Sequence, residues 1–291
     1  MLDAANDPCP APLPLLGSLD FKLPRGACDS HAHVIASDFN LYPLTQQRSY
    51  TPAVASENQY LGMLDGLGFD RGVLVQPSVY GTDNRYLLEV LARHSQRLRG
   101  VAVVPPDSSE GTLAHLHEQG VRGIRFNLLF RGGLDLGLLE PLAARVAAYG
   151  WHIQLLIDVR DLPQLADRLI RLPCPVVIDH MGHLPASEGV RNPGFRLLLE
   201  GLKQHGWWVK LSGAYRLGAM APDYAEADPL AAALIAANPA RLVWGSDWPH
   251  VAQKSMPDTV RLLNRLAVWA PDSALRRRIL VDNPRELYDF H

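Results

Sequence analysis

The chain alternates eight short apolar runs with segments of helical periodicity, and this alternation limits the possible fold more than any other feature. The runs occupy residues 26–34, 72–77, 100–105, 121–127, 151–157, 174–180, 207–212 and 241–247. Amphipathic segments between them include residues 84–97, 113–119, 138–149, 162–171, 195–205 and 229–237. Eight such alternations in 291 residues predict an α/β protein with a (β/α)8 TIM barrel. A doubly wound sheet would carry a glycine-rich phosphate turn after its first strand, where this chain has Asp29-Ser30-His31-Ala32-His33.

The predicted barrel covers most of the chain. Residues 1–25 are rich in proline and are predicted to form an extension packed on the surface, and residues 26–291 a single barrel domain. C-terminal helices are expected over residues 272–281 and 284–290, outside the barrel. The longest stretch without periodicity, residues 35–55, follows the first strand, so we expect it at the catalytic mouth as a lid.

Charge and cysteine content exclude several classes of function. With 28 basic and 30 acidic residues the net charge is −2, which gives no electrostatic footprint for nucleic acid or an anionic membrane. No apolar stretch approaches the length of about 18 residues that a membrane span needs. The three cysteines, Cys9, Cys28 and Cys174, are scattered and odd in number, which is typical of a reducing cytoplasm. The oligomeric state stays open, a homo-oligomer included.

Three histidines and one aspartate fall at predicted carboxyl ends of strands, where barrel enzymes place their active sites. Residues two apart on a strand point to the same face, so His31 and His33 can reach one point. His180 ends the sixth run, and Asp247 ends the eighth, which neighbours the first in a barrel. The alternatives are hydrogen-bonded core histidines and an aspartate that caps the next helix. Their positions favour a catalytic group of these four residues.

Three imidazoles and one carboxylate fit two chemical roles, and both predict a hydrolase. They could ligate one divalent metal that activates water, with Asp247 moving the proton. They could also act without metal, the imidazoles polarising a carbonyl oxygen while Asp247 deprotonates water. Along the seventh run, Lys210 is at a position whose side chain is expected to point into the barrel, and it is interpreted as a buried, paired lysine rather than a Schiff-base nucleophile.

Arginines near the same strand ends indicate the kind of substrate. Arg125 and Arg131 follow the fourth run, and Arg216 follows the seventh. A planar guanidinium can bind carboxylate or phosphate through two parallel hydrogen bonds. Three of them around one pocket predict a small anionic molecule, most simply a dicarboxylate, although any of them could instead form a surface salt bridge. Further substrate hydrogen bonds are expected from Ser78, Tyr50 and Asn127.

Six motifs in order along the chain resemble the amidohydrolase superfamily, and most of all its branch of 2-pyrone-4,6-dicarboxylate hydrolases. They are residues 29–33 (DSHAH), 76–81 (QPSVYG), 122–127 (RGIRFN), 179–182 (DHMG), 210–216 (KLSGAYR) and 245–250 (GSDWPH). The resemblance implies a distorted (β/α)8 barrel that opens a lactone ring with water. Asp247 would be the base, and His31, His33 and His180 would polarise the lactone carbonyl. The residues implied to hold the two carboxylates are Arg125, Arg131, Arg216, Tyr50 and Ser78.

The resemblance also bears on the cofactor. Two-metal members of the superfamily use a bridging Lys or Glu on the fourth strand and a His on the fifth. Here the fourth run ends in Arg-Phe-Asn, and the fifth carries its one histidine at the opposite end. We therefore expect no two-metal centre. The resemblance to the pyrone-dicarboxylate hydrolases, which do not need a divalent ion, implies that no cofactor is required. The alternative is one divalent ion, Zn or Mn, on His31, His33, His180 and Asp247.

The favoured function is cytoplasmic hydrolysis of a carboxylated lactone, 2-pyrone-4,6-dicarboxylate or a close relative, in aromatic-acid catabolism. One alternative on the same barrel is a sugar-acid lactonase or a lactone isomerase. Another is a mononuclear metal-dependent amidohydrolase or decarboxylase. A barrel that binds a carboxylated ligand without catalysis completes the alternatives.

Overall fold

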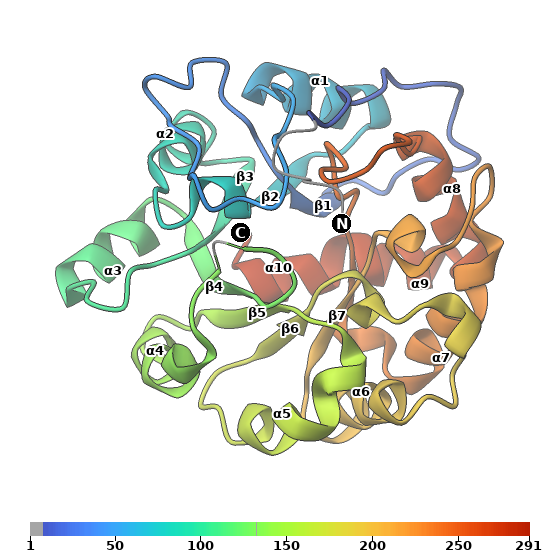
Figure 1. The fold of residues 1–291 in the computed structure, drawn as a ribbon. Coiled ribbons are helices and arrows are strands. Elements are labelled where there is room, and N and C mark those ends of the chain that lie inside the picture. Colours follow the sequence, from blue (N-terminus) through green and yellow to red (C-terminus); the bar gives the residue numbers. More distant parts are fainter. Residues whose placement is uncertain (1–7, 132) are drawn as a thin grey trace.

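Eight parallel strands pair in chain order in the part of the chain that the structure, a computed structural model, describes, which is residues 8–131 and 133–291 (Figure 1). The strands are β1 Cys28–Ala32, β2 Arg71–Val75, β3 Leu98–Ala102, β4 Val121–Asn127, β5 His152–Leu156, β6 Val176–Ile178, β7 Trp208–Leu211 and β8 Leu242–Trp244. Each overlaps one of the predicted runs. The (β/α)8 barrel expected from the alternation is confirmed.

Helices surround the strands and cover their outer faces (Figure 1). They are α1 Glu57–Leu67, α2 Arg85–Arg93, α3 Glu110–Glu118, α4 Leu139–Ala147, α5 Leu162–Ile170, α6 Pro193–Gln204, α7 Asp228–Ala237, α8 Thr259–Trp269, α9 Ser273–Arg277 and α10 Asn283–Tyr288. Both sides of a parallel barrel are buried, so its strands consist of nearly continuous buried residues. No helix among the described residues is long and apolar enough to cross a membrane.

β1 and β8 close the barrel through a small number of specific contacts. The backbone N–H of Asp247 donates to the carbonyl of His31 at 2.8 Å. The buried Asp29 carboxylate accepts from the backbone N–H of Ser246 at 2.7 Å and from its hydroxyl at 2.6 Å. Gly245 lies so close to β1 that an added Cβ would be 2.6 Å from the Cβ of His31. The first and last strands are therefore held together next to the predicted catalytic residues.

The C-terminal residues close the opposite end of the barrel. The Tyr288 ring of α10 lies 5.5 Å from the His152 ring of β5, measured between centroids. The Phe290 ring lies beneath the guanidinium groups of Arg71 and Arg99, at 4.9 and 4.7 Å. Cation–π contacts of this kind add to the apolar packing of the ring. The C-terminal residues therefore pack across this end, opposite the carboxyl ends of the strands where the predicted site residues lie.

The start of the described chain lies against two loops at the barrel mouth. Cys9 donates its backbone N–H to the carbonyl of Thr51 at 2.8 Å, and its sulfur accepts from the backbone N–H of Ala252 at 3.3 Å. Thr51 belongs to the loop after β1, and Ala252 to the loop after β8. Residues 1–7 of the predicted N-terminal extension lie outside the described residues.

Candidate active site

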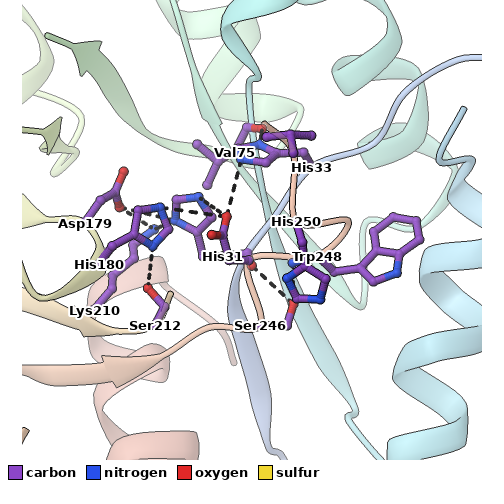
Figure 2. A network of polar contacts seen from close by, with 12 residues as sticks. His31, His33, Val75, Asp179, His180, Lys210, Ser212, Ser246, Trp248 and His250 are labelled. Atoms are coloured by element: carbon purple, nitrogen blue, oxygen red, sulfur yellow. Dashed lines mark hydrogen bonds and ion pairs between the residues drawn. The ribbon is translucent and has the colours of Figure 1, made fainter. Parts of the chain in front are cut away.

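The predicted catalytic residues converge at the carboxyl ends of β1, β6 and β8. His31 belongs to β1 and His33 follows it, His180 lies two residues beyond the end of β6, and Asp247 follows β8. All four are at least 98% buried. The Nε2 atoms of the three imidazoles lie 3.8, 3.9 and 3.8 Å from one atom, Oδ1 of Asp247. Figure 2 shows the three rings facing a common point.

Hydrogen bonds at the other ring nitrogen hold two of the imidazoles in place (Figure 2). The Nδ1 of His33 lies 2.7 Å from the carbonyl oxygen of Val75 at the end of β2, to which it can only donate. The Nδ1 of His180 lies 2.9 Å from the hydroxyl of Ser212 after β7. Such contacts on one ring nitrogen orient the other toward the centre of a site.

The two carboxylate oxygens of Asp247 differ, because one is held by hydrogen bonds and the other has no partner in the described chain. Its Oδ2 accepts from the Tyr215 hydroxyl at 2.6 Å and from Nε of Arg216. Its Oδ1 is buried and has no hydrogen-bond partner among the described residues. The backbone at Asp247 has φ = 60°, a region that is sparsely populated except by glycine and is frequent at functional sites. Burial raises the pKa of this carboxyl, but Arg216, His180 and His31 outweigh burial and hold the pKa well below its usual range.

The imidazoles are neutral near pH 7. Burial lowers the pKa of His33 and of His180 well below the ordinary value of 6.5 and also lowers that of His31. A neutral imidazole keeps a lone pair on one nitrogen, which is the form that ligates a metal. The site therefore combines one ionised carboxylate with three uncharged nitrogen groups.

A buried polar layer lies beneath His31. Lys210 donates to the carbonyl of Ser30 at 3.0 Å and to the side-chain oxygen of Gln154 at 2.7 Å. The Asp179 carboxylate accepts from Nε2 of Gln154 at 3.0 Å and lies 3.6 Å from the Lys210 ammonium. Burial lowers the pKa of Lys210 to about 8. The lysine is thus buried and paired, as its inward-facing position on the seventh run indicates.

A small cavity lies next to this group. Eight of the predicted site residues line it: His33, Tyr50, Ser78, Arg125, Asn127, His180, Arg216 and Asp247. Phe130, Leu156 and Val251 contribute apolar side chains to the same wall. His31 lies against the other imidazoles, with ring centroids 5.0 Å from His33 and 4.6 Å from His180.

The structure separates the three predicted arginines. Arg125 is 4% exposed and donates to the carbonyl of Gln76 at 3.2 Å, while its Nε has no partner in the described chain. Arg216 is engaged by Asp247, so its guanidinium holds the candidate base. Arg131 is exposed, and its backbone N–H donates to the hydroxyl of Ser49 at 2.9 Å. Arg125 therefore has the guanidinium nitrogen that is most available to a ligand in the cavity.

The loop after β1 covers the mouth, as its length and position predict. Its ends are paired through two backbone hydrogen bonds between Ile35 and Ala55, of 2.7 and 3.1 Å. Tyr50 is 4% exposed and lines the cavity, with its ring 5.9 Å from that of Phe130. Burial raises the pKa of Tyr50 to about 12, so its hydroxyl stays protonated and can donate.

The sequence profile of the amidohydrolase family matches residues 28–290. The chain belongs to this family. It is 38% identical to the 2-pyrone-4,6-dicarboxylate hydrolase of Comamonas testosteroni, over 92% of each chain. It is 34% identical to a 4-sulfomuconolactone hydrolase of Hydrogenophaga intermedia, over 96% of this chain and 94% of the relative. The crystal structure of a putative 2-pyrone-4,6-dicarboxylic acid hydrolase from Pseudomonas putida superposes with a TM-score of 0.82 at 39% identity, covering 92% of this chain and 99% of that one.

The expectation that this amidohydrolase needs no cofactor is wrong. Ligand atoms of His31, His33 and Asp247 lie within 4.8 Å of one another, as do those of His31, Asp179 and His180. Nε2 of His31 and Oδ1 of Asp247 are buried without hydrogen-bond partners among the described residues, as atoms that meet a metal would be. Ligand atoms about 2.1 Å from a tetrahedral zinc are about 3.4 Å apart, and the three Nε2 atoms lie 3.8–3.9 Å from Oδ1 of Asp247. A family member from Burkholderia multivorans, 20% identical and with a TM-score of 0.69 over 90% of this chain and 99% of its own, was crystallised with bound zinc. These findings indicate one divalent ion, the alternative that the donor set had left open.

Several residues of the amidohydrolase site were not among the predicted ones. Asp179 and Gln154 are inward residues of the polar layer, and Tyr215 holds Asp247. Asp179 and Tyr215 lie within the family motifs, next to predicted residues, which is the signal that could have found them. The apolar residues Phe130 and Leu156 carry no chemical signal, and only the folded barrel shows that they line the cavity.

Proposed function

We propose that this amidohydrolase hydrolyses a carboxylated lactone, 2-pyrone-4,6-dicarboxylate or a close relative. The observation that carries the proposal is the convergence of three neutral imidazole Nε2 atoms on the unpaired Oδ1 of Asp247, inside a cavity that also contains Arg125. The relatives that match over nearly the whole chain are named for anionic lactones, one dicarboxylated and one sulfonated. Both the reaction class and the negative charge of the substrate agree with the site.

Asp247 is proposed as the base that takes a proton from water. Tyr215 and Arg216 hold Oδ2, so Oδ1 remains directed at the imidazoles and at the cavity. Because its pKa is well below the usual range, the carboxylate is ionised and ready to accept a proton throughout the physiological pH range. When the ring opens, the same group can return the proton to the departing ring oxygen.

His31, His33 and His180, with Oδ1 of Asp247, are the residues that would hold a divalent ion. Zinc or manganese bound there would polarise the lactone carbonyl and lower the pKa of a water molecule. The imidazoles are suited to this task because they are neutral, and because the Nδ1 atoms of His33 and His180 already have partners. Their Nε2 lone pairs can then face the centre.

The cavity walls favour a flat, carboxylated ring over a polyhydroxylated one. The unpaired Nε of Arg125 and the unpaired Nδ2 of Asn127 are buried donors on the side of β4, where a carboxylate would satisfy them. Tyr50 and Ser78 line the same cavity and can donate further hydrogen bonds. The apolar side chains there offer no partner for ring hydroxyls. A sugar-acid lactone would leave hydroxyl groups buried without hydrogen bonds.

Turnover of 2-pyrone-4,6-dicarboxylate by the purified protein tests this function, since ring opening removes the absorbance of the conjugated pyrone. We expect hydrolysis of the pyrone, weaker turnover of 4-sulfomuconolactone and much weaker turnover of aldarolactones. Asp247→Asn keeps the shape and removes the charge, and it should lower kcat about 1,000-fold. Efficient turnover of aldarolactones with none of the pyrone would contradict the substrate, and full activity of the variant would contradict the base.

We place this activity in the cytoplasm, without nucleic-acid or membrane partners. Cys9, Cys28 and Cys174 are all free thiols, as expected in a reducing compartment. The net charge of −2 offers no attraction to polyanions. Thiol titration of protein purified without reductant provides a check, with three free thiols per chain expected.

A further inference from the structure

The contacts of His31 determine what this imidazole offers to the centre of the site. Its Nδ1 lies 3.2 Å from Oδ1 of Asp179 and 3.2 Å from Nζ of Lys210 (Figure 2). A neutral imidazole carries its single proton on either Nδ1 or Nε2. A proton on Nδ1 is donated to Asp179 and leaves a lone pair on Nε2. A proton on Nε2 lets Nδ1 accept from Lys210 and makes Nε2 a donor instead of a ligand.

The hydrogen-bonding capacity of Lys210 decides between these two forms. Its ammonium has three protons, and two go to the carbonyl of Ser30 and the side-chain oxygen of Gln154. The third can reach either Nδ1 of His31, at 3.2 Å, or Oδ1 of Asp179, at 3.6 Å. If it goes to His31, then Oδ1 of Asp179 stays without a donor, because this buried atom has no hydrogen-bond partner in the described structure. An ionised acceptor buried without a donor is more costly than any other loss in this group.

With the proton on Nδ1 of His31, each buried group in the layer has a donor or an acceptor nearby. Nδ1 lies 3.2 Å from Oδ1 of Asp179, to which it can donate, and the third proton of Lys210 is free to approach the same carboxylate. The other oxygen, Oδ2, accepts from Nε2 of Gln154 at 3.0 Å and lies 3.6 Å from Nη2 of Arg125. Asp179 and Lys210 are both fully buried, so neither can exchange these partners for bulk water.

We propose that Asp179, held by Gln154 and Lys210, keeps His31 in the tautomer with its proton on Nδ1 and thereby presents an unprotonated Nε2 to a divalent ion. Asp179 is a positioning residue, because it acts through His31. A carboxylate that orients a metal-binding histidine also makes that histidine a stronger ligand. The inference rests on the proposed site but does not depend on which lactone is hydrolysed.

The tautomer can be observed directly in the metal-free wild-type protein labelled with 15N-histidine. Protonated and unprotonated ring nitrogens resonate far apart, and the His31→Asn spectrum identifies the signals of His31 by their loss. We expect a protonated Nδ1 and an unprotonated Nε2. The reverse pattern would overturn the proposal. In Lys210→Met the same tautomer should persist, because Asp179 still accepts the proton, whereas a change of tautomer would assign control to the lysine.

Zinc affinity gives a second readout that needs no substrate. Asp179→Asn keeps the shape of the side chain and removes its charge, and competition with a chromophoric chelator should show zinc bound about 10- to 100-fold more weakly. Asp228→Asn is the matched control, because its carboxylate pairs with Arg265 on the outer helices. Its zinc affinity should stay within about twofold of wild type. Wild-type affinity in Asp179→Asn would overturn the proposal, and the wild-type spectrum decides the question if that variant does not fold.

The outcomes separate this inference from the proposed function. A protein that shows the expected tautomer and zinc affinities but opens no lactone contradicts the function alone. An active lactone hydrolase whose His31 carries its proton on Nε2 contradicts only the role of Asp179.

Discussion

Replacing Gly245 by alanine tests whether the close approach of β8 to β1 determines the geometry of the active site. An added Cβ would lie 2.6 Å from Cβ and 2.8 Å from the backbone nitrogen of His31. Ordinary contact begins at 3.4 Å, so the strands would have to separate by about 0.8 Å at this point. Neither contacted atom is the end of a flexible side chain. The strain therefore falls on the two strands that carry His31 and Asp247.

The expected loss follows from this displacement. Misplacing reacting groups by about 1 Å can cost about 100-fold in rate, or about 2.7 kcal/mol. We expect kcat/KM of Gly245→Ala on the pyrone to fall about 30- to 100-fold. Overpacking of a buried position should also lower the free energy of unfolding by about 1–3 kcal/mol. Steady-state kinetics and urea denaturation measure the two effects separately.

Gly66 in α1 provides a matched control. A Cβ added there would also lie 2.6 Å from a neighbouring atom, but that atom is Cδ1 of Leu15, the end of a flexible side chain that can turn away. Alanine is favoured over glycine inside a helix by about 1 kcal/mol, so Gly66→Ala should keep full activity and equal or greater stability. Activity of Gly245→Ala within threefold of wild type would refute the reasoning, and so would an equal loss in Gly66→Ala.

Three further predictions concern the substrate, pH and the metal. Arg125→Met should raise KM for the pyrone about 10- to 100-fold, because it removes the buried unpaired donor, whereas Arg131→Met at the exposed position should change KM less. Equal effects of the two variants in steady-state kinetics would contradict the role of Arg125 in substrate binding. Burial lowers the pKa of His152 to about 3 and of His250 to about 4. Below pH 6.5 the unfolded chain therefore binds protons that the folded chain does not, and the free energy of unfolding should fall by about 2 kcal/mol per histidine between pH 7 and 5. Burial raises the pKa of Asp29 to about 6, which offsets about 1 kcal/mol of that loss; denaturation curves that show no decrease would exclude buried neutral histidines. Dialysis against a chelator should lower both activity and the midpoint of thermal unfolding, and zinc or manganese should restore both, whereas unchanged values would argue against a bound ion.

The barrel and the convergence of its strand-end residues could be predicted because both follow from periodicity. Alternation of strands and helices determines which ends share a face, so His31, His33, His180 and Asp247 could be grouped before any coordinates were known. The roles of these residues stay predictions until the variants are measured. The helix over Glu57–Leu67 was not among the predicted segments quoted above, although Ser56 and Gln59 form a capping box at its start, a pattern visible in the sequence.

Side-chain directions in the loops could not be predicted in the same way. Three arginines near strand ends look alike in sequence, yet Arg125 and Arg216 line the cavity, Arg216 also holds Asp247, and Arg131 is exposed. Loop backbones have no fixed period that would distinguish these outcomes. The error about the metal has a different cause. Missing ligands on the fourth and fifth strands argue against a two-metal centre, but a single ion needs only donors at the ends of β1, β6 and β8.

The position of Cys9 has a consequence for how this protein is handled. Its backbone and sulfur bridge the loop that carries Tyr50 and the loop that follows Asp247, so the first described residues form part of the cover over the cavity. A fusion partner or purification tag attached just before them would pull on both loops at once. We expect N-terminally tagged preparations to release product at a different rate from untagged ones, and thiol-blocking reagents that reach Cys9 to change this rate as well. Kinetic constants should therefore be compared only between preparations whose N-termini are identical.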